Sequence, residues 1–110
     1  MLAVVLFFVL GFLFSPRPDT QIPFNSEGWN RNSDNERLRM VNDLRLKLKG
    51  LNKARVSQLL GEPITDLGRY PGDYYYYGLG TQTRFLDTDG IWLCIKFRNG
   101  HVDAVQVAHD

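Results

Sequence analysis

The chain is poor in the side chains that catalysis and metal binding usually require, with one cysteine and two histidines in 110 residues. Cys94 alone can form neither an internal disulfide nor a multi-cysteine metal site. His101 and His109 lie beside a predicted turn and next to the last residue, and no acid and base recur at a recognisable spacing. We therefore expect no enzymatic activity, no cofactor, no metal and no small-molecule substrate.

Three short patterns resemble parts of functional motifs. Asp87-x-Asp89-Gly90 lacks the remaining ligands of a calcium loop. Gly78-Leu79-Gly80 is not followed by a predicted helix, so it does not form a phosphate cradle. Cys94 is predicted to be buried, where a thiol acts as a small hydrophobe and not as the nucleophile of a small hydrolase. Each pattern is better explained by a role in the fold than by a binding or catalytic role.

The chain also has no large excess of positive or of negative charge. The 13 basic and 12 acidic residues leave a net charge of +1, and no basic run exceeds two residues. Proteins that bind nucleic acid concentrate positive charge on one face. We expect no nucleic-acid partner.

Residues 1–15 contain a continuous apolar run from Leu2 to Phe14, broken only by Gly11. As a helix this run would reach about 20 Å, short of the roughly 30 Å hydrocarbon core of a membrane. It is predicted to be a signal peptide or a short membrane anchor, contacting the membrane through residues 2–14 if it is not cleaved. No basic residue precedes it, so a start further upstream is one alternative, and a buried element of the domain is another.

Residues 16–32 are rich in Pro, Asn and Ser, and three prolines within eight residues predict an extended linker. Phe24 and Trp29 are isolated aromatic residues in this segment. They are expected to contact the domain or a partner, and the alternative is that the linker folds back over the face of the sheet that is turned away from the helices.

Residues 33–110 are predicted to form an α+β domain, with two N-terminal helices packed on one face of a three- to four-stranded antiparallel sheet. Ser33 and Glu36 have the spacing of a capping box, and Gly50 can end the first helix. Asn52 caps a second helix over 53–60. The first helix carries a basic face that could contact acidic lipid or protein but is more typical of a solvated surface: Arg37, Arg45, Lys47 and Lys49.

The strand half begins with a short strand predicted over 64–69, a turn, and a tyrosine-rich strand over 74–79. Residues 80–90 are predicted to be a polar loop carrying Phe85 and Leu86. Asn99-Gly100 predicts a two-residue hairpin turn, which sets the pairing of the last two strands. In that pairing Lys96 faces Asp103, Cys94 faces Val105 and Trp92 faces Val107.

This register divides the sheet into two faces. The face toward the helices is expected to carry Ile91, Leu93, Ile95, Phe97, Val102 and Ala104. The outer face is expected to carry a Lys96–Asp103 ion pair, with Trp92, Cys94, Val105, Val107 and one alternate pair of tyrosines, either Tyr74 and Tyr76 or Tyr75 and Tyr77. Apolar and aromatic residues on an outer face indicate a protein-contact surface.

Several phrases, read in order over residues 38–107, give a family resemblance. They are Met40-x-x-x-Leu44, Gly50-Leu51, Val56-x-x-Leu59-Leu60-Gly61-x-Pro63, Tyr77-x-Leu79-Gly80, and Trp92-Leu93-x-Ile95-x-Phe97-x-Asn99-Gly100-x-Val102. This order resembles the SmpA/OmlA (BamE-like) family of the bacterial outer membrane, with a fold similar to β-lactamase-inhibitor-protein repeats. The resemblance implies a binding module, although the lipid-carrying cysteine usual in that family is missing.

The predicted function is a non-enzymatic binding module of the bacterial cell envelope, periplasmic or membrane-anchored, with an envelope protein as partner. Its predicted contact residues are Trp92, Val105, Val107, Tyr74 and Tyr76. The alternative is an inhibitor-type module that acts on an enzyme through the 80–90 loop, with Phe85 and Leu86 as anchors.

Overall fold

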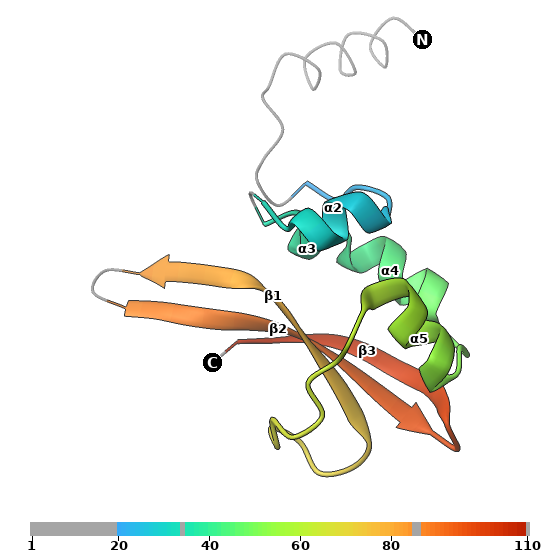
Figure 1. The fold of residues 1–110 in the computed structure, drawn as a ribbon. Helices are drawn as coiled ribbons and strands as arrows, with labels where there is room; N and C mark the ends of the chain where they lie inside the picture. Colours follow the sequence, from blue (N-terminus) through green and yellow to red (C-terminus); the bar gives the residue numbers. More distant parts are fainter. Residues whose placement is uncertain (1–19, 34, 85–86, 110) are drawn as a thin grey trace, which may run out of the picture.

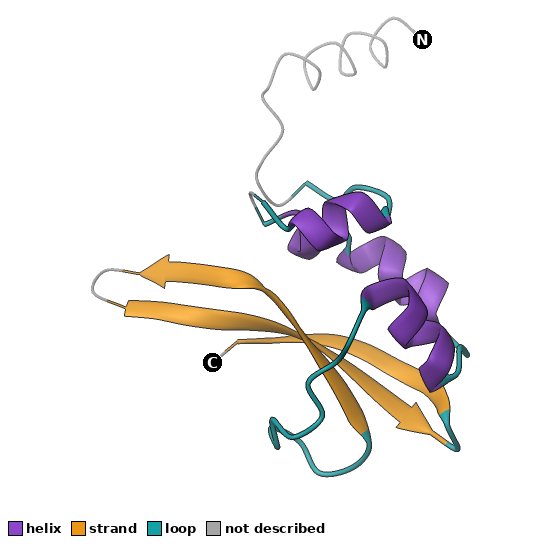
Figure 2. Ribbon diagram, viewed as in Figure 1, coloured by secondary structure: helices purple, strands orange, loops and turns teal. Residues whose placement is uncertain are grey.

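The computed structural model describes residues 20–33, 35–84 and 87–109 (Figure 1). The elements in chain order are α2 (Ser26–Arg31), α3 (Glu36–Arg39), α4 (Val41–Leu48), α5 (Lys53–Leu60), β1 (Tyr74–Arg84), β2 (Asp87–Arg98) and β3 (His101–His109). The three strands form an antiparallel sheet in the order β1-β2-β3. The helices precede the strands and lie over one face of the sheet (Figure 2), which confirms the α+β prediction.

The second predicted helix is confirmed, whereas the first is divided. The side chain of Asn52 accepts a hydrogen bond from the backbone N–H of Arg55 at 2.9 Å and begins α5. Met40 interrupts the expected first helix and separates α3 from α4. The expected cap also differs, because Asn35 is the N-cap of α3 and the Ser33 hydroxyl contacts the Glu36 carboxylate at 2.8 Å.

The described part of the predicted linker, residues 20–32, belongs to the folded domain. The backbone N–H of Ile22 donates to the Arg39 carbonyl at 2.7 Å, and that of Phe24 donates to the Asp43 carboxylate at 2.7 Å. This segment also contains α2, whose Trp29 is fully buried. The extended-linker prediction is wrong for these residues because burying an indole and pairing the backbone outweigh the local preference for an extended chain.

Two predictions for the strand half are also corrected. Residues 64–69 form no strand, and Ile64 makes a single bridge to Tyr76. Residues 80–90, predicted to be a loop, are largely strand, because β1 and β2 stay paired from Thr81↔Gly90 to Arg84↔Asp87. Phe85 and Leu86 lie outside the described residues. Since the pairing of β3 reaches only Ile91↔His109, the paired part of β1 and β2 beyond it forms a two-stranded arm (Figure 1).

The predicted register of the last hairpin is confirmed at the turn and is wrong beyond Phe97. Asn99 and Gly100 have φ values of 52° and 79°, as a two-residue turn requires, and Arg98 pairs with His101. Between Lys96 and Phe97 the register shifts by one residue, so that Lys96 faces Ala104 and not Asp103. A bulge of this kind turns every later side chain of β3 to the opposite face.

The shift places valines where small or polar side chains were expected. Val105 and Val107 pair with Ile95 and Leu93 and pack against the core beneath the helices. Ala104, expected in that core, is exposed instead. Burying two valines in place of Ala104 and Gln106 removes more apolar surface from water, which is a physical reason for the bulge.

The main core lies between the helices and the sheet. Its largest buried side chains come from both the helices and the sheet: Trp29, Met40, Leu44, Leu48, Val56, Leu79, Leu93 and Ile95. A second, smaller cluster of Tyr76, Cys94 and Ala108 lies on the other face of the sheet.

Candidate binding surfaces

The outer face of the sheet carries a cluster of aromatic side chains, here called the aromatic outer face: Tyr70, Tyr74, Tyr76 and Trp92. Tyr74 and Tyr76 alternate along β1 and stack with ring centroids 5.6 Å apart and an interplanar angle of 15°. Tyr70 lies 5.4 Å from Tyr74 and extends the row. Trp92 comes from β2, where its Cα partners are Gly78 and Ala108. Small neighbours leave room for the indole to lie over the sheet.

The loop between α5 and β1 holds one side of this face. The backbone N–H of Tyr70 donates to the Tyr76 hydroxyl at 3.2 Å. The Arg69 guanidinium donates to the His109 carbonyl at 2.7 Å and lies 5.6 Å from the centroid of the Tyr70 ring. Because Leu60 packs in the main core and Tyr70 packs on the outer face, this loop passes from one face of the sheet to the other.

The structure places three of the five predicted contact residues on the outer face. Trp92 and Tyr74 are half-buried there and can contact a partner. Tyr76 is only 2% exposed, so it supports the face from beneath. Val105 and Val107 lie on the helix face because of the bulge, so the prediction that they belong to the outer face is wrong.

Cys94 is fully buried among these aromatic residues and does not resemble an activated nucleophile. Burial raises the pKa of its thiol, and the more weakly acting Arg69 opposes this shift. The thiol is therefore protonated at neutral pH and packs as a small apolar group. His101 and His109 are exposed at the two ends of β3. Among the described residues, no group of three His, Cys, Asp or Glu side chains is placed to hold a metal ion.

Trp29 and Arg37 join the N-terminal segment to the helices and the sheet. The Trp29 indole donates to the Leu60 carbonyl at 2.8 Å. The Arg37 guanidinium donates to the carbonyls of Trp29 and Gly78, each at 2.8 Å, and lies 4.4 Å from the indole centroid. Burial lowers the pKa of Arg37. Arg37 was expected on the basic surface of the first helix, and helical periodicity alone gave no indication that its guanidinium would bind backbone carbonyls.

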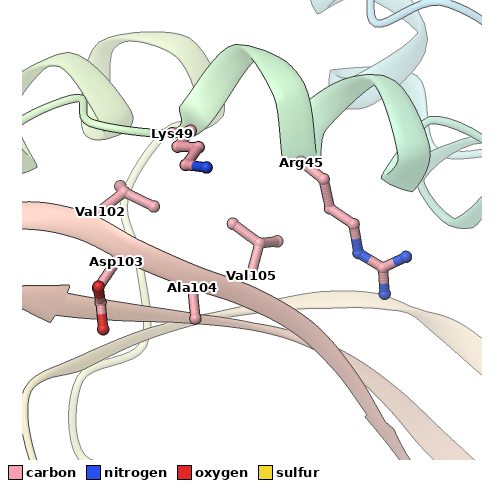
Figure 3. A pocket seen from close by; sticks show the side chains of 6 residues that line it. All are labelled: Arg45, Lys49, Val102, Asp103, Ala104 and Val105. Carbon is pink, nitrogen blue, oxygen red and sulfur yellow. The ribbon is translucent and has the colours of Figure 1, made fainter.

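A groove lies between α4 and β3, here called the α4–β3 groove (Figure 3). Its volume is about 270 Å³, and its lining residues are Arg45, Lys49, Val102, Asp103, Ala104 and Val105. A second hollow of about 520 Å³ lies beside the end of α5, lined by Ser57, Gly61, Glu62, Pro63, Thr65 and Tyr75. The first hollow differs in its chemistry, because two cations border the edge of the sheet there, Arg45 in α4 and Lys49 directly after it.

The chain matches no protein-family model, no curated protein and no solved structure. Among the helices of residues 20–33, 35–84 and 87–109, none is long and apolar enough to span a bilayer.

Proposed function

We propose that this protein is a non-enzymatic binding module of the bacterial cell envelope and that its aromatic outer face contacts a protein partner. The observation that carries the proposal is the exposed part of Trp92 and Tyr74 on a sheet face that the helices do not cover. Tyrosine and tryptophan are enriched where proteins meet, because they combine a large apolar area with a polar tip. The apolar segment from Leu2 to Phe14 and the SmpA/OmlA resemblance support the envelope location.

Site-specific photo-crosslinking in intact cells tests this assignment. A photoreactive phenylalanine analogue at position 92 retains an aromatic side chain on the outer face. We expect it to form a defined adduct with an envelope protein, seen as a discrete higher-mass band in the membrane or periplasmic fraction.

Leu46 is the matched control position because it is 79% exposed and lies on α4, on the helix side of the sheet. The same analogue at position 46 should not give that band. Equal crosslinking at both positions, or none at position 92, would show that the outer face is not the contact surface.

The second candidate function is an inhibitor-type module that contacts an enzyme through the β1–β2 arm. The observation that favours it is the extension of this arm past β3 (Figure 1). In the same crosslinking experiment, adducts from position 85 without adducts from position 92 would support this alternative.

A further inference from the structure

At its start, the edge of the sheet along β3 is paired with the backbone between α4 and α5. The backbone N–H of Val102 donates to the Leu51 carbonyl at 2.8 Å, and its carbonyl accepts from the N–H of Gly50 at 3.2 Å. At the far end of this edge, the Arg69 guanidinium donates to the His109 carbonyl, and among the described residues no backbone hydrogen bond reaches the outward backbone groups between these two points. Most of this edge therefore remains open.

The register shows which backbone groups point outward from this open edge. The backbone N–H of Phe97 donates to the Asp73 carbonyl, so the backbone groups of Phe97 point toward β1. The backbone groups of its partner Val102 therefore point away from β2. Ile95 and Leu93 lie two and four residues before Phe97 on β2, and they pair with Val105 and Val107 of β3. Because backbone direction alternates along a strand, the N–H and C=O groups of Val105 and Val107 also point outward.

The α4–β3 groove lies beside these groups, with α4 above the edge strand. Val105 points toward α4, whereas Asp103 and Ala104 project away from it (Figure 3). Arg45 lies in the last turn of α4 and Lys49 is the C-cap residue directly after it, and both side chains line the groove. Both are exposed, and neither forms an ion pair with any carboxylate of the described residues.

We propose that the α4–β3 groove binds an acidic, extended segment of a protein partner, which adds to β3 as a fourth strand. The outward groups of Val105 and Val107 would pair with the backbone of the added strand. Alternate side chains of that strand would point to the helix side of the sheet, where Arg45 and Lys49 attract carboxylates. The groove is on a different surface from the aromatic outer face, so this proposal does not depend on the proposed function.

The charge distribution favours such a segment over a second copy of this chain. If two copies paired through their β3 edges, each would bring its own Arg45 and Lys49 to the shared seam. Like charges that are brought together at an interface oppose association, whereas an acidic strand neutralises them.

Selection from a random peptide library tests the proposal. Random eight-residue peptides displayed on phage are selected on the full chain in a non-ionic detergent. We expect enrichment of acidic residues at alternate positions, together with β-branched residues that favour strands. For the selected peptides, the amides of Val105 and Val107 should exchange hydrogen more slowly when peptide is bound.

The test variant is Arg45→Glu with Lys49→Glu, and the matched control is Lys96→Glu with Arg98→Glu. Both pairs change the net charge equally, and all four residues are exposed. We expect the test variant to weaken binding of the selected peptides by about tenfold or more and the control to change it little.

Three results would overturn the proposal. They are no enrichment at all, selected peptides without an acidic excess, and equal binding by the test and control variants. A concentration-dependent dimer that itself protects Val105 and Val107 from exchange would also overturn it, by showing that a second copy occupies the edge.

Discussion

Arg37 shows how one side chain can hold three parts of this fold together. Its guanidinium donates to a carbonyl of α2 and to a carbonyl of β1, and it stacks near an indole of the main core. A guanidinium suits this position because its donors form a planar fork and its face packs on an aromatic ring. A lysine would present a single ammonium and could not reproduce the geometry.

Replacing Arg37 by lysine is expected to lower the free energy of unfolding by about 1–3 kcal/mol, because one of the two carbonyls would lose its donor. Urea denaturation followed by tryptophan fluorescence measures this change. Arg45→Lys is the control because Arg45 is exposed, and it should change the free energy of unfolding by less than about 0.5 kcal/mol. Equal effects of the two substitutions would contradict the role given to Arg37.

At the scale of the element, the bulge in β3 decides which side chains face the helices. The turn at Asn99-Gly100 fixes the start of the hairpin, but the extra residue at Asp103 and Ala104 reverses the faces of the remaining strand. Trp92 and Cys94 stay on the outer face because they belong to β2, whereas Val105 and Val107 move inward. The outer face is therefore narrower and more aromatic than a regular hairpin would make it.

Disulfide formation with the native Cys94 distinguishes the two registers. Gln106 is its Cα partner in the structure, whereas Val105 would be its partner in a regular hairpin. Directly paired residues have Cα atoms about 5.5 Å apart, within the range that a disulfide spans. We expect Gln106→Cys to form an intramolecular disulfide under mild oxidation and Val105→Cys to remain reduced. Thiol titration after denaturation and intact mass report the result, and the reverse outcome would show that the bulge is not present.

At the scale of the whole molecule, two carboxylates attach residues 20–32 to the rest of the domain. The Glu36 carboxylate pairs with Arg31 at 2.7 Å. Its bonds from Arg31 and Ser33 lower its pKa from 4.5 to about 2. The Asp43 carboxylate accepts from the Phe24 N–H and pairs with Lys47 at 2.9 Å, and these contacts lower its pKa as well.

These lowered pKa values predict a loss of stability in acid. A carboxylate whose pKa is lower in the folded chain stabilises it fully above its ordinary pKa, and this contribution disappears as the pH falls toward the folded value. For Glu36 the affected range runs from about pH 4.5 down to about pH 2. The urea midpoint should therefore fall between about pH 6 and about pH 3.

The variant Glu36→Gln with Asp43→Asn should show a smaller fall in urea midpoint than the unmodified chain. Glu62→Gln is the control, since Glu62 is exposed and lies outside these contacts. Tryptophan fluorescence is a suitable signal because Trp29 belongs to the attached segment and is fully buried. An unchanged pH dependence in the double variant would show that other groups cause the acid sensitivity.

Features that depend on a few neighbouring residues could be predicted from the sequence. The bounds of α5, its Asn52 cap and the Asn99-Gly100 turn all agree with the structure. So does the inward alternation of Ile91, Leu93, Ile95 and Phe97 along β2. In each case the deciding interaction is a local hydrogen bond, a backbone conformation or the two-residue period of a strand.

The tertiary structure decided the features that depend on what covers each surface. The docking of Trp29, the binding of Arg37 and the bulge in β3 each require partners far away in the chain. No local pattern specifies them, because the favourable term is burial against a surface that exists only after the helices and strands have assembled. The sequence alone therefore determined α5 with its cap, the two faces of β2 and the turn between the last two strands, whereas packing decided which residues of β3 lie on each face of the sheet.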